Sequence, residues 1–234
     1  MNDLHNAFSP FSRMKKLLWL VLTLIYLILS ISLFSACKKE LALMDYVSEL
    51  RSNIFLADTN ELSLRIYSVT KETPYVADGV PCEKSTRLEA RLSAPSGDKD
   101  CYLSFSVNGK TYGGEMSFDN VKTEYYYSCT LDVSALNTID CVVEYGESRV
   151  EMQALSVINK DTLSPNDVLN KLKNAEVELF SSMTDKYGFA GEIYLRLIYE
   201  DFPYYYVGVI DRNGNVTAFL INAQTGKILA KRTT

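Results

Sequence analysis

The chain has 234 residues, with 24 lysines and arginines against 29 aspartates and glutamates, and a net charge of −5. This acidic balance argues against a nucleic-acid-binding protein and against one that coats an anionic membrane surface. The charges are dispersed rather than blocked, which is typical of a solvated surface. The length allows one medium domain or two small ones, each with its own core.

Residues 14–37 carry the strongest pattern near the N-terminus. Lys15 and Lys16 precede an apolar run over residues 17–36. Positive charge before such a run holds the N-terminal side in the cytoplasm while the run enters the bilayer. The run is long enough to span a bilayer. The sequence therefore predicts an export signal or a retained membrane anchor, with the bulk of the chain extracytoplasmic.

The end of this run resembles the lipobox of bacterial lipoproteins. It reads Leu33-Phe34-Ser35-Ala36-Cys37, with Phe34 where leucine is usual. The resemblance implies cleavage before Cys37 and attachment of membrane lipid to its sulfur. In the alternative, the segment stays as a single transmembrane helix. Either reading predicts a cell-membrane protein, lipid-anchored or single-pass.

Residues 38–60 are expected to form a short amphipathic helix and a linker. Leu43, Tyr46 or Val47, Leu50 and Ile54 recur at helical spacing, which predicts a helix over residues 40–53. Few residues would then separate the lipid site at Cys37 from the folded part, so the next domain would be held close to the membrane.

Residues 61–158 alternate between apolar and polar side chains in short segments separated by turn residues. Asn108-Gly109 is the strongest short hairpin signal among these turns. Strands that recur without intervening helices predict an antiparallel β-sandwich with an immunoglobulin-like pattern. The buried tryptophan of antibody-type domains is absent, since the only tryptophan is Trp19. This middle domain matches no particular family.

Four cysteines lie within that middle domain: Cys82, Cys101, Cys129 and Cys141. An even number in an exported chain indicates two disulfides. Three connectivities are possible. We favour 129–141 with 82–101, because residues 129 and 141 lie symmetrically about a presumed bend near Ala135.

Residues 162–234 are predicted to be a small α+β domain, which leaves the chain as a whole mainly β. Ser164 is a good N-cap and Pro165 suits the first helical position, so we expect a helix from there to about Thr184. Strand-like segments follow, with turns at residues 212–214 and 223–226. One helix would cover a three- or four-stranded antiparallel meander.

Part of this C-terminal domain, over about residues 164–232, resembles the PepSY family of small exported domains. The strand at residues 206–211, the turn at Asn213-Gly214 and the segment LINAQTGKIL at residues 220–229 carry the resemblance. Asn222 stands where the family's final turn usually has aspartate. The resemblance implies a cell-envelope protein, an association with protease inhibition or regulation, and no cofactor.

Histidine chemistry is excluded from the predicted exported part, because the only histidine, His5, precedes the apolar run. That part has no Ser-His-Asp or Cys-His arrangement and no histidine ligand for zinc. It also lacks a glycine-rich phosphate loop, since Gly113-Gly114 is typical of a bulge or turn. We therefore expect no catalytic residue, no metal, no cofactor and no nucleic-acid partner.

Tyrosine is abundant, with 16 in the chain and two triplets at residues 125–127 and 204–206. In a strand each triplet places at least one ring on each face, either in buried aromatic pairs or on an exposed aromatic surface. The loop at residues 71–85 is a second recognition candidate. The predicted partner-binding residues are Tyr75, Tyr125, Tyr127, Tyr204 and Tyr206.

These observations predict a membrane-anchored extracytoplasmic lipoprotein that is not an enzyme and that binds an envelope protein or peptide. The alternative is a structural or assembly accessory subunit of a membrane protein complex, with the helix over residues 40–53 as its contact.

Overall fold

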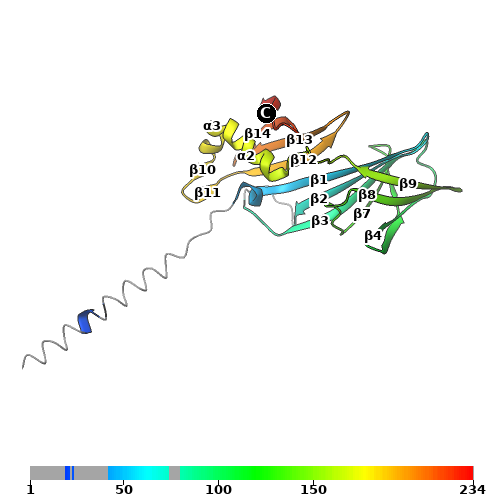
Figure 1. The fold of residues 1–234 in the computed structure, drawn as a ribbon, viewed down its shortest axis with the longest axis horizontal. Coiled ribbons are helices and arrows are strands. Elements are labelled where there is room, and N and C mark those ends of the chain that lie inside the picture. The colour runs from blue at the N-terminus through cyan, green and yellow to red at the C-terminus, as the bar shows by residue number, and fades with distance from the viewer. Residues whose placement is uncertain (1–18, 22, 24–41, 74–79, 234) are drawn as a thin grey trace, which may run out of the picture. The chain divides into compact units, whose positions relative to one another are not determined.

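The computed structural model describes residues 19–21, 23, 42–73 and 80–233, and Figure 1 draws the rest as a grey trace. The chain divides into two compact units, Met1–Glu40 and Leu41–Thr234. In the first unit, residues 19–21 and 23 are helical. Within the described part of the chain, no helix is both long enough and apolar enough to cross a membrane. The rest of the predicted signal or anchor, with Cys37, lies outside the described residues.

The Leu41–Thr234 unit is mainly β, which confirms the predicted class. A 3-10 turn and nine strands come first: η1 (Leu43–Tyr46), β1 (Val47–Asp58), β2 (Ser63–Glu72), β3 (Lys84–Ser93), β4 (Cys101–Val107), β5 (Lys110–Glu115), β6 (Ser117–Asp119), β7 (Glu124–Cys129), β8 (Thr138–Tyr145) and β9 (Ser148–Ser156). Two helices and six strands follow: α2 (Pro165–Ala175), α3 (Val177–Ser182), β10 (Thr184–Asp185), β11 (Gly188–Phe189), β12 (Glu192–Tyr199), β13 (Pro203–Ile210), β14 (Val216–Asn222) and β15 (Ile228–Thr233).

Strand β1 corrects the predicted helix over residues 40–53 and the linker that was to follow it. In the described part of that stretch only η1 is helical, and the chain is extended from Val47. β2 pairs antiparallel along one edge of β1, while β12 and β9 share the other edge. A few apolar residues at helical spacing cannot distinguish a helix from a buried strand, and backbone hydrogen bonds on both edges decide for the strand.

The first half of the unit is a near-closed, barrel-like sheet. Its strands run in the order β6-β7-β3-β2-β1-β9-β8-β4-β5. Asn108 and Gly109 both have positive φ, 51° and 74°, and close the β4–β5 hairpin, as their dipeptide predicts. The predicted immunoglobulin-like sandwich is not confirmed, because hydrogen bonding continues through β1 and β9 from one side of the barrel to the other.

The second half is an antiparallel meander of β12, β13, β14 and β15, with α2 and α3 on one face (Figure 1). The predicted cap is confirmed, since the Ser164 hydroxyl accepts a hydrogen bond from the Asp167 N–H at 3.2 Å. The expected single helix is two short ones, with Glu176 between them.

Two hydrophobic cores lie along this one continuous sheet. Phe55 and Ala57 of β1 belong to the core inside the barrel, whereas Val47 and Ile54 belong to the core beneath the helices. The predicted domains at residues 61–158 and 162–234 therefore share a strand that was assigned to neither of them.

Candidate partner-binding face

In the first tyrosine triplet, Tyr125 and Tyr127 were predicted to lie on an exposed surface, but both rings lie in or against the barrel core. Tyr125 is 2% exposed in the barrel core, and its hydroxyl donates to the Lys99 carbonyl oxygen at 2.7 Å. Tyr127 lies on the same face of β7 and packs edge-on against the Phe105 ring. Tyr125 is therefore wrong as a partner-binding residue and Tyr127 is part of the core's edge. Tyr126, on the other face of β7, was missed.

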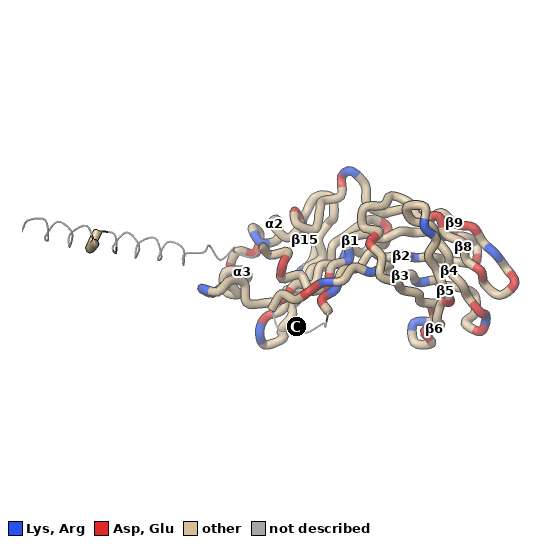
Figure 2. Tube along the Cα trace, turned by 90° about the horizontal axis from the view of Figure 1, so that it is seen from below, with Lys and Arg blue, Asp and Glu red and all other residues tan. Residues whose placement is uncertain are grey.

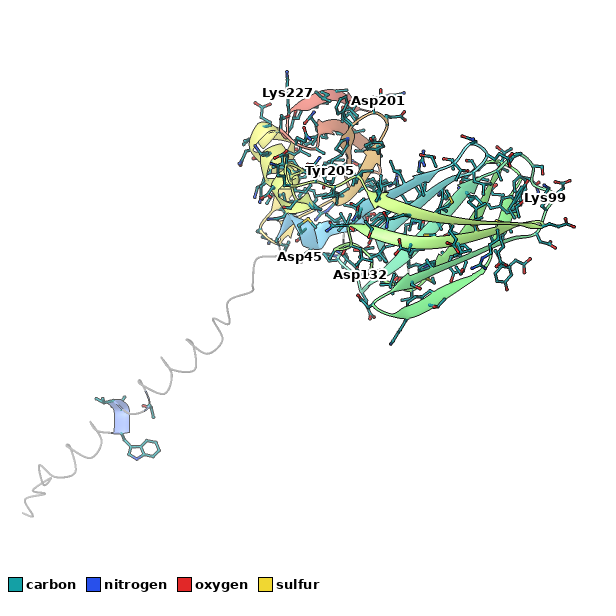
Figure 3. The ribbon with its side chains drawn as sticks, turned by 45° about the vertical axis from the view of Figure 1, so that its right-hand side comes forward. Asp45, Lys99, Asp132, Asp201, Tyr205 and Lys227 are labelled. Carbon is teal, nitrogen blue, oxygen red and sulfur yellow. The ribbon has the colours of Figure 1, made fainter. Side chains whose placement is uncertain are left out.

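The second triplet supports the prediction of an aromatic surface more closely. Tyr205 is fully buried in the core beneath the helices, where its hydroxyl donates to the Leu163 carbonyl oxygen at 3.0 Å (Figure 3). Because side chains alternate along a strand, Tyr204 and Tyr206 lie on the opposite face of β13, where both are half-buried. The remaining candidate, Tyr75, lies outside the described residues.

Register places an arginine and a second tyrosine beside Tyr206. Arg196 of β12 is its direct partner, and the guanidinium lies 6.0 Å from the Tyr206 ring centre and 5.0 Å from that of Tyr194. The same guanidinium donates to both carboxylate oxygens of Glu49 on β1, at 2.9 and 2.7 Å. Burial lowers the pKa of Arg196, but its hydrogen bonds and charge interaction with Glu49 raise it above its ordinary value overall.

The same face continues across three more strands. Arg196 pairs with Arg51 of β1, Arg51 with Val69 of β2, and Val69 with Arg87 of β3. Residues opposite one another in neighbouring strands point to the same side of a sheet. We call Arg196, Arg51 and Arg87 the arginine row. Together with Tyr67, Tyr194, Tyr204 and Tyr206, this row forms the tyrosine–arginine face.

Arg51 is the least satisfied cation of this face. Its guanidinium lies 4.5 Å from the centre of the Tyr67 ring, and its Nη1 makes a long hydrogen bond of 3.5 Å to the Leu197 carbonyl oxygen. Its Nε is buried with no hydrogen-bond partner among the described residues. Burial lowers the pKa of Arg51, Tyr67 and Glu49 raise it in part, and Arg196 lowers it further. The protein therefore holds a desolvated positive charge here that its own groups compensate incompletely.

Buried carboxylates elsewhere have structural partners. Glu192 of β12 accepts a hydrogen bond from the Ser48 hydroxyl, which joins β12 to β1. Glu72 accepts the backbone N–H of Cys82 at 3.2 Å, and Glu89 forms an ion pair with Lys71 at 3.2 Å. Within the described ranges, no group of three or more histidine, cysteine, aspartate or glutamate side chains could hold a metal ion.

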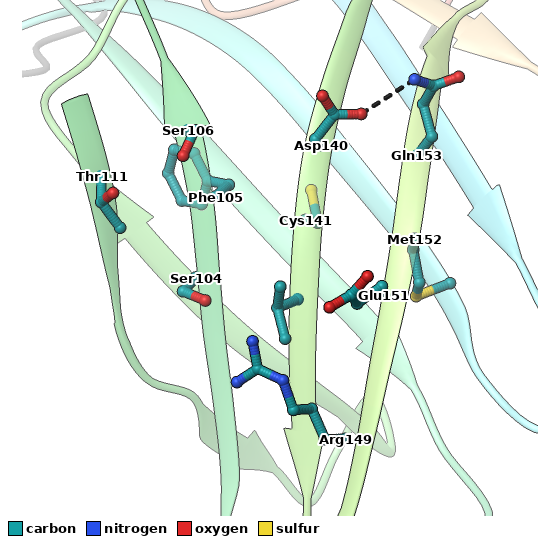
Figure 4. A pocket seen from close by; sticks show the side chains of 11 residues that line it. Ser104, Phe105, Ser106, Thr111, Asp140, Cys141, Arg149, Glu151, Met152 and Gln153 are labelled. Carbon is teal, nitrogen blue, oxygen red and sulfur yellow. Dashed lines mark hydrogen bonds between the residues drawn. The ribbon is translucent and has the colours of Figure 1, made fainter. Parts of the chain in front are cut away.

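A hollow lies on the outer surface of β4, β5, β8 and β9, with a volume of about 630 Å³ (Figure 4). Its polar lining includes Ser104, Thr111 and Arg149, and the Gln153 amide donates to the Asp140 carboxylate at 2.9 Å. It is an open depression on a sheet surface and is lined by hydroxyl, amide and ion-pairing groups.

Acidic and basic residues are interspersed over the whole unit, as Figure 2 shows, so no region stands out by net charge alone.

The four cysteines of the unit are free thiols, so the predicted pairs 82–101 and 129–141 are not formed. Cys101 and Cys141 are buried in the barrel core from β4 and β8, and Cys129 is half-buried at the end of β7. Cys82 is exposed in the segment before β3. The spacing argument was wrong because residues 129 and 141 belong to strands that do not pair with each other. The even count of cysteines consequently lends no support to the predicted localisation.

Alkylation of the folded protein should separate these thiols. We expect iodoacetamide to modify Cys82 readily and to leave Cys101 and Cys141 unmodified until the protein is unfolded. Burial raises the pKa of Cys101 to about 11 and that of Cys141 to about 12, and only the thiolate reacts. Site-resolved mass spectrometry gives the extent at each cysteine. Failure of any of the four to react after unfolding without reductant would restore the disulfide prediction.

The tyrosine–arginine face thus gathers four tyrosines and three arginines from β1, β2, β3, β12 and β13. Its residues on β12 and β13 lie on the side of the meander away from α2 and α3, whereas Tyr67 also packs against the core that contains Ile54. Sequence reasoning found Tyr204 and Tyr206 but missed the arginines, whose neighbours come from strands far apart in the chain.

Comparison with protein-family models, curated proteins and solved structures finds no match for this chain.

Proposed function

We propose that this chain is a membrane-anchored extracytoplasmic lipoprotein whose Leu41–Thr234 unit is a non-catalytic binding module for a protein or peptide. The partner docks on the tyrosine–arginine face. The observation that carries the proposal is the register of β12 with β1, which places Tyr194, Arg196 and Arg51 side by side and half-buried.

The chemistry of this face is that of protein interfaces. Tyrosine and arginine are enriched among the residues that contribute most binding energy, because each combines a large contact area with polar groups. The side chains are already held by ring contacts and by the Arg196–Glu49 ion pair. A partner therefore meets a largely ordered surface, which lowers the entropic cost of binding.

The anchor completes the proposal. Residues 14–37 direct export, and Cys37 carries lipid or the segment is retained as a helix. The PepSY resemblance over residues 164–232 supports a role in the cell envelope, where a small module of this kind regulates or recruits another protein. The accessory-subunit alternative assigned its contact to a helix over residues 40–53. Since β1 occupies the second half of that stretch, the binding-module proposal is preferred.

Site-specific photo-crosslinking tests the proposal. Tyr206 on the face and Tyr102, which is 51% exposed on β4, are each replaced by the photoreactive azidophenylalanine, a substitution that keeps the aromatic ring. We expect a discrete crosslinked partner in native membranes from position 206 and none from position 102. The readout is mass spectrometry of the crosslinked species. Equal crosslinking at both positions, or none at 206, would contradict docking on this face.

A further inference from the structure

The tyrosine–arginine face carries more positive charge than its own carboxylates neutralise. Glu49 is engaged by Arg196 at 2.7 Å, Glu89 by Lys71 at 3.2 Å, and Glu124 by Arg91 at 2.6 Å. Among the described residues, Arg51 and Arg87 have no carboxylate within ion-pair distance. Arg87 donates only to the Ser128 hydroxyl, at 2.8 Å.

We propose that the arginine row binds an acidic segment of the partner, with a carboxylate of that segment seated on the Arg51 guanidinium. This inference rests on the proposed function and names the chemistry that the face recognises.

The environment of Arg51 provides the driving force. A guanidinium withdrawn from water is costly unless it is paired, and the Tyr67 ring at 4.5 Å offsets only part of that cost. Glu49 contributes favourable charge from beyond ion-pair distance, but burial outweighs it and the neighbouring charges of Arg196 and Arg91 oppose it, so the site is short of negative charge. A carboxylate accepts two parallel hydrogen bonds from a guanidinium, so it supplies the missing charge, whereas the Nε is buried out of a partner's reach.

The backbone next to Arg51 is also irregular. The pairing of β1 with β2 shifts register between Arg51 and Asn53. Such bulges change the direction of the side chains beside them and are common next to binding sites. Here the bulge lies at the centre of the row, between Val47 and Ile54, which both belong to the core beneath the helices.

The residues on either side of the arginine row favour an extended peptide over a membrane surface as its ligand. On one side of the row, register places Tyr194, Glu49 and Lys71, and on the other it places Tyr67 and Glu89. Carboxylates therefore flank the cations on both sides. Both carboxylates are ion-paired, so the charges left for a ligand lie in the single line of the row, which an extended acidic strand matches and a plane of lipid headgroups does not. The tyrosine rings provide apolar contact for the residues between its acids, whereas Val69, between Arg51 and Arg87 in the register, is 2% exposed and covered by its neighbours.

Binding of synthetic peptides to the full chain in neutral detergent tests this proposal. The probe is an acidic peptide of repeated Ser-Glu-Glu-Leu, compared with a counterpart in which every glutamate is glutamine. We expect the acidic peptide to bind and the glutamine peptide not to bind, with an affinity that falls as salt is raised. Arg51→Gln should weaken binding at least about tenfold, as expected for loss of a charge-assisted bidentate contact.

Two further variants keep the result interpretable. Arg149→Gln removes the same charge from an exposed ion pair on β9 and should change the affinity less than about twofold. Arg87→Gln tests the row at a surface position, where the fold does not depend on the side chain, and should weaken binding as well. Unchanged affinity in both Arg51→Gln and Arg87→Gln would overturn the proposal. Binding to phosphatidylglycerol vesicles that requires Arg51 and matches the acidic peptide in strength would also overturn it.

The two proposals fail in different ways. If position 206 crosslinks a partner but the acidic peptide neither binds nor competes with it, the binding module stands and the acidic specificity is overturned. If position 206 gives no crosslink while the acidic peptide binds through Arg51, the specificity stands and the proposed protein-binding function is overturned.

Discussion

Replacing Phe55 by alanine is expected to lower the free energy of unfolding by about 3–5 kcal/mol. Phe55 is fully buried in the barrel core at the point where β1 pairs with both β2 and β9. The truncation leaves a cavity that a surrounding sheet, hydrogen-bonded on both edges of β1, cannot collapse to fill. Since a domain has only about 5–15 kcal/mol of stability in total, the variant should be close to unfolding at room temperature. Urea titration measures the change.

Leu155→Ala is the matched control. Leu155 lies one strand away on β9, opposite Leu56 of β1, and is 53% exposed. Its truncation should change stability by no more than about 0.5 kcal/mol. Because β1 also contributes Val47 and Ile54 to the core beneath the helices, tyrosine fluorescence and the helical circular dichroism signal should change together in Phe55→Ala. Two separate transitions, with the helices unaffected, would show that the two cores are independent.

The fragment of residues 61–158 is expected to remain unfolded when it is expressed alone. It contains every strand of the barrel except β1, which is hydrogen-bonded to β2 along its length and to β9 at Phe55 and Leu56. Without β1, the inner edge of β2 loses its backbone partners and the barrel core loses Phe55 and Ala57. Unpaired backbone groups and an open core together exceed the stability of a domain of this size.

The comparison that decides this prediction is with residues 42–234, which keep β1 and both cores. We expect a well-dispersed amide proton spectrum from that longer fragment and a narrow, coil-like spectrum from residues 61–158. A dispersed spectrum from residues 61–158 would mean that β1 is dispensable and that the boundary placed at residue 61 from the sequence is a true domain boundary.

Local chemistry explains which features were predictable. Asn108-Gly109 closes a hairpin because both residues tolerate positive φ, and Ser164 caps α2 because its hydroxyl reaches the third residue on. Each of these depends on residues within a few positions in the sequence. The mainly β class, most strand positions and the C-terminal meander follow from alternation in the same way.

Non-local pairing explains the errors. The stretch that was expected to be a helix at residues 40–53 belongs to β1 from Val47 onward, because partners far away in the chain hydrogen-bond to its edges. The cysteine pairing was wrong for a similar reason, since symmetry about a bend in sequence does not make two strands neighbours. Alternation also leaves open which face of a strand is buried, so Tyr125 was placed on the surface when it is in the core.

The same distinction between local chemistry and non-local pairing applies to the candidate site. Tyr204 and Tyr206 could be named as candidates from the sequence, because a triplet in a strand places at least one ring on each of its faces. The arginine row could not, since Arg51 and Arg196 are separated by most of the chain and meet only through the parallel register of β1 with β12. The sequence by itself determined strand content, turns, caps and the tyrosine-rich composition, all of which depend on short-range sterics and hydrogen bonding. Only the tertiary structure decided that one strand serves two cores and that the same strand carries an incompletely compensated arginine, because both depend on the order and register of strands distant in the chain.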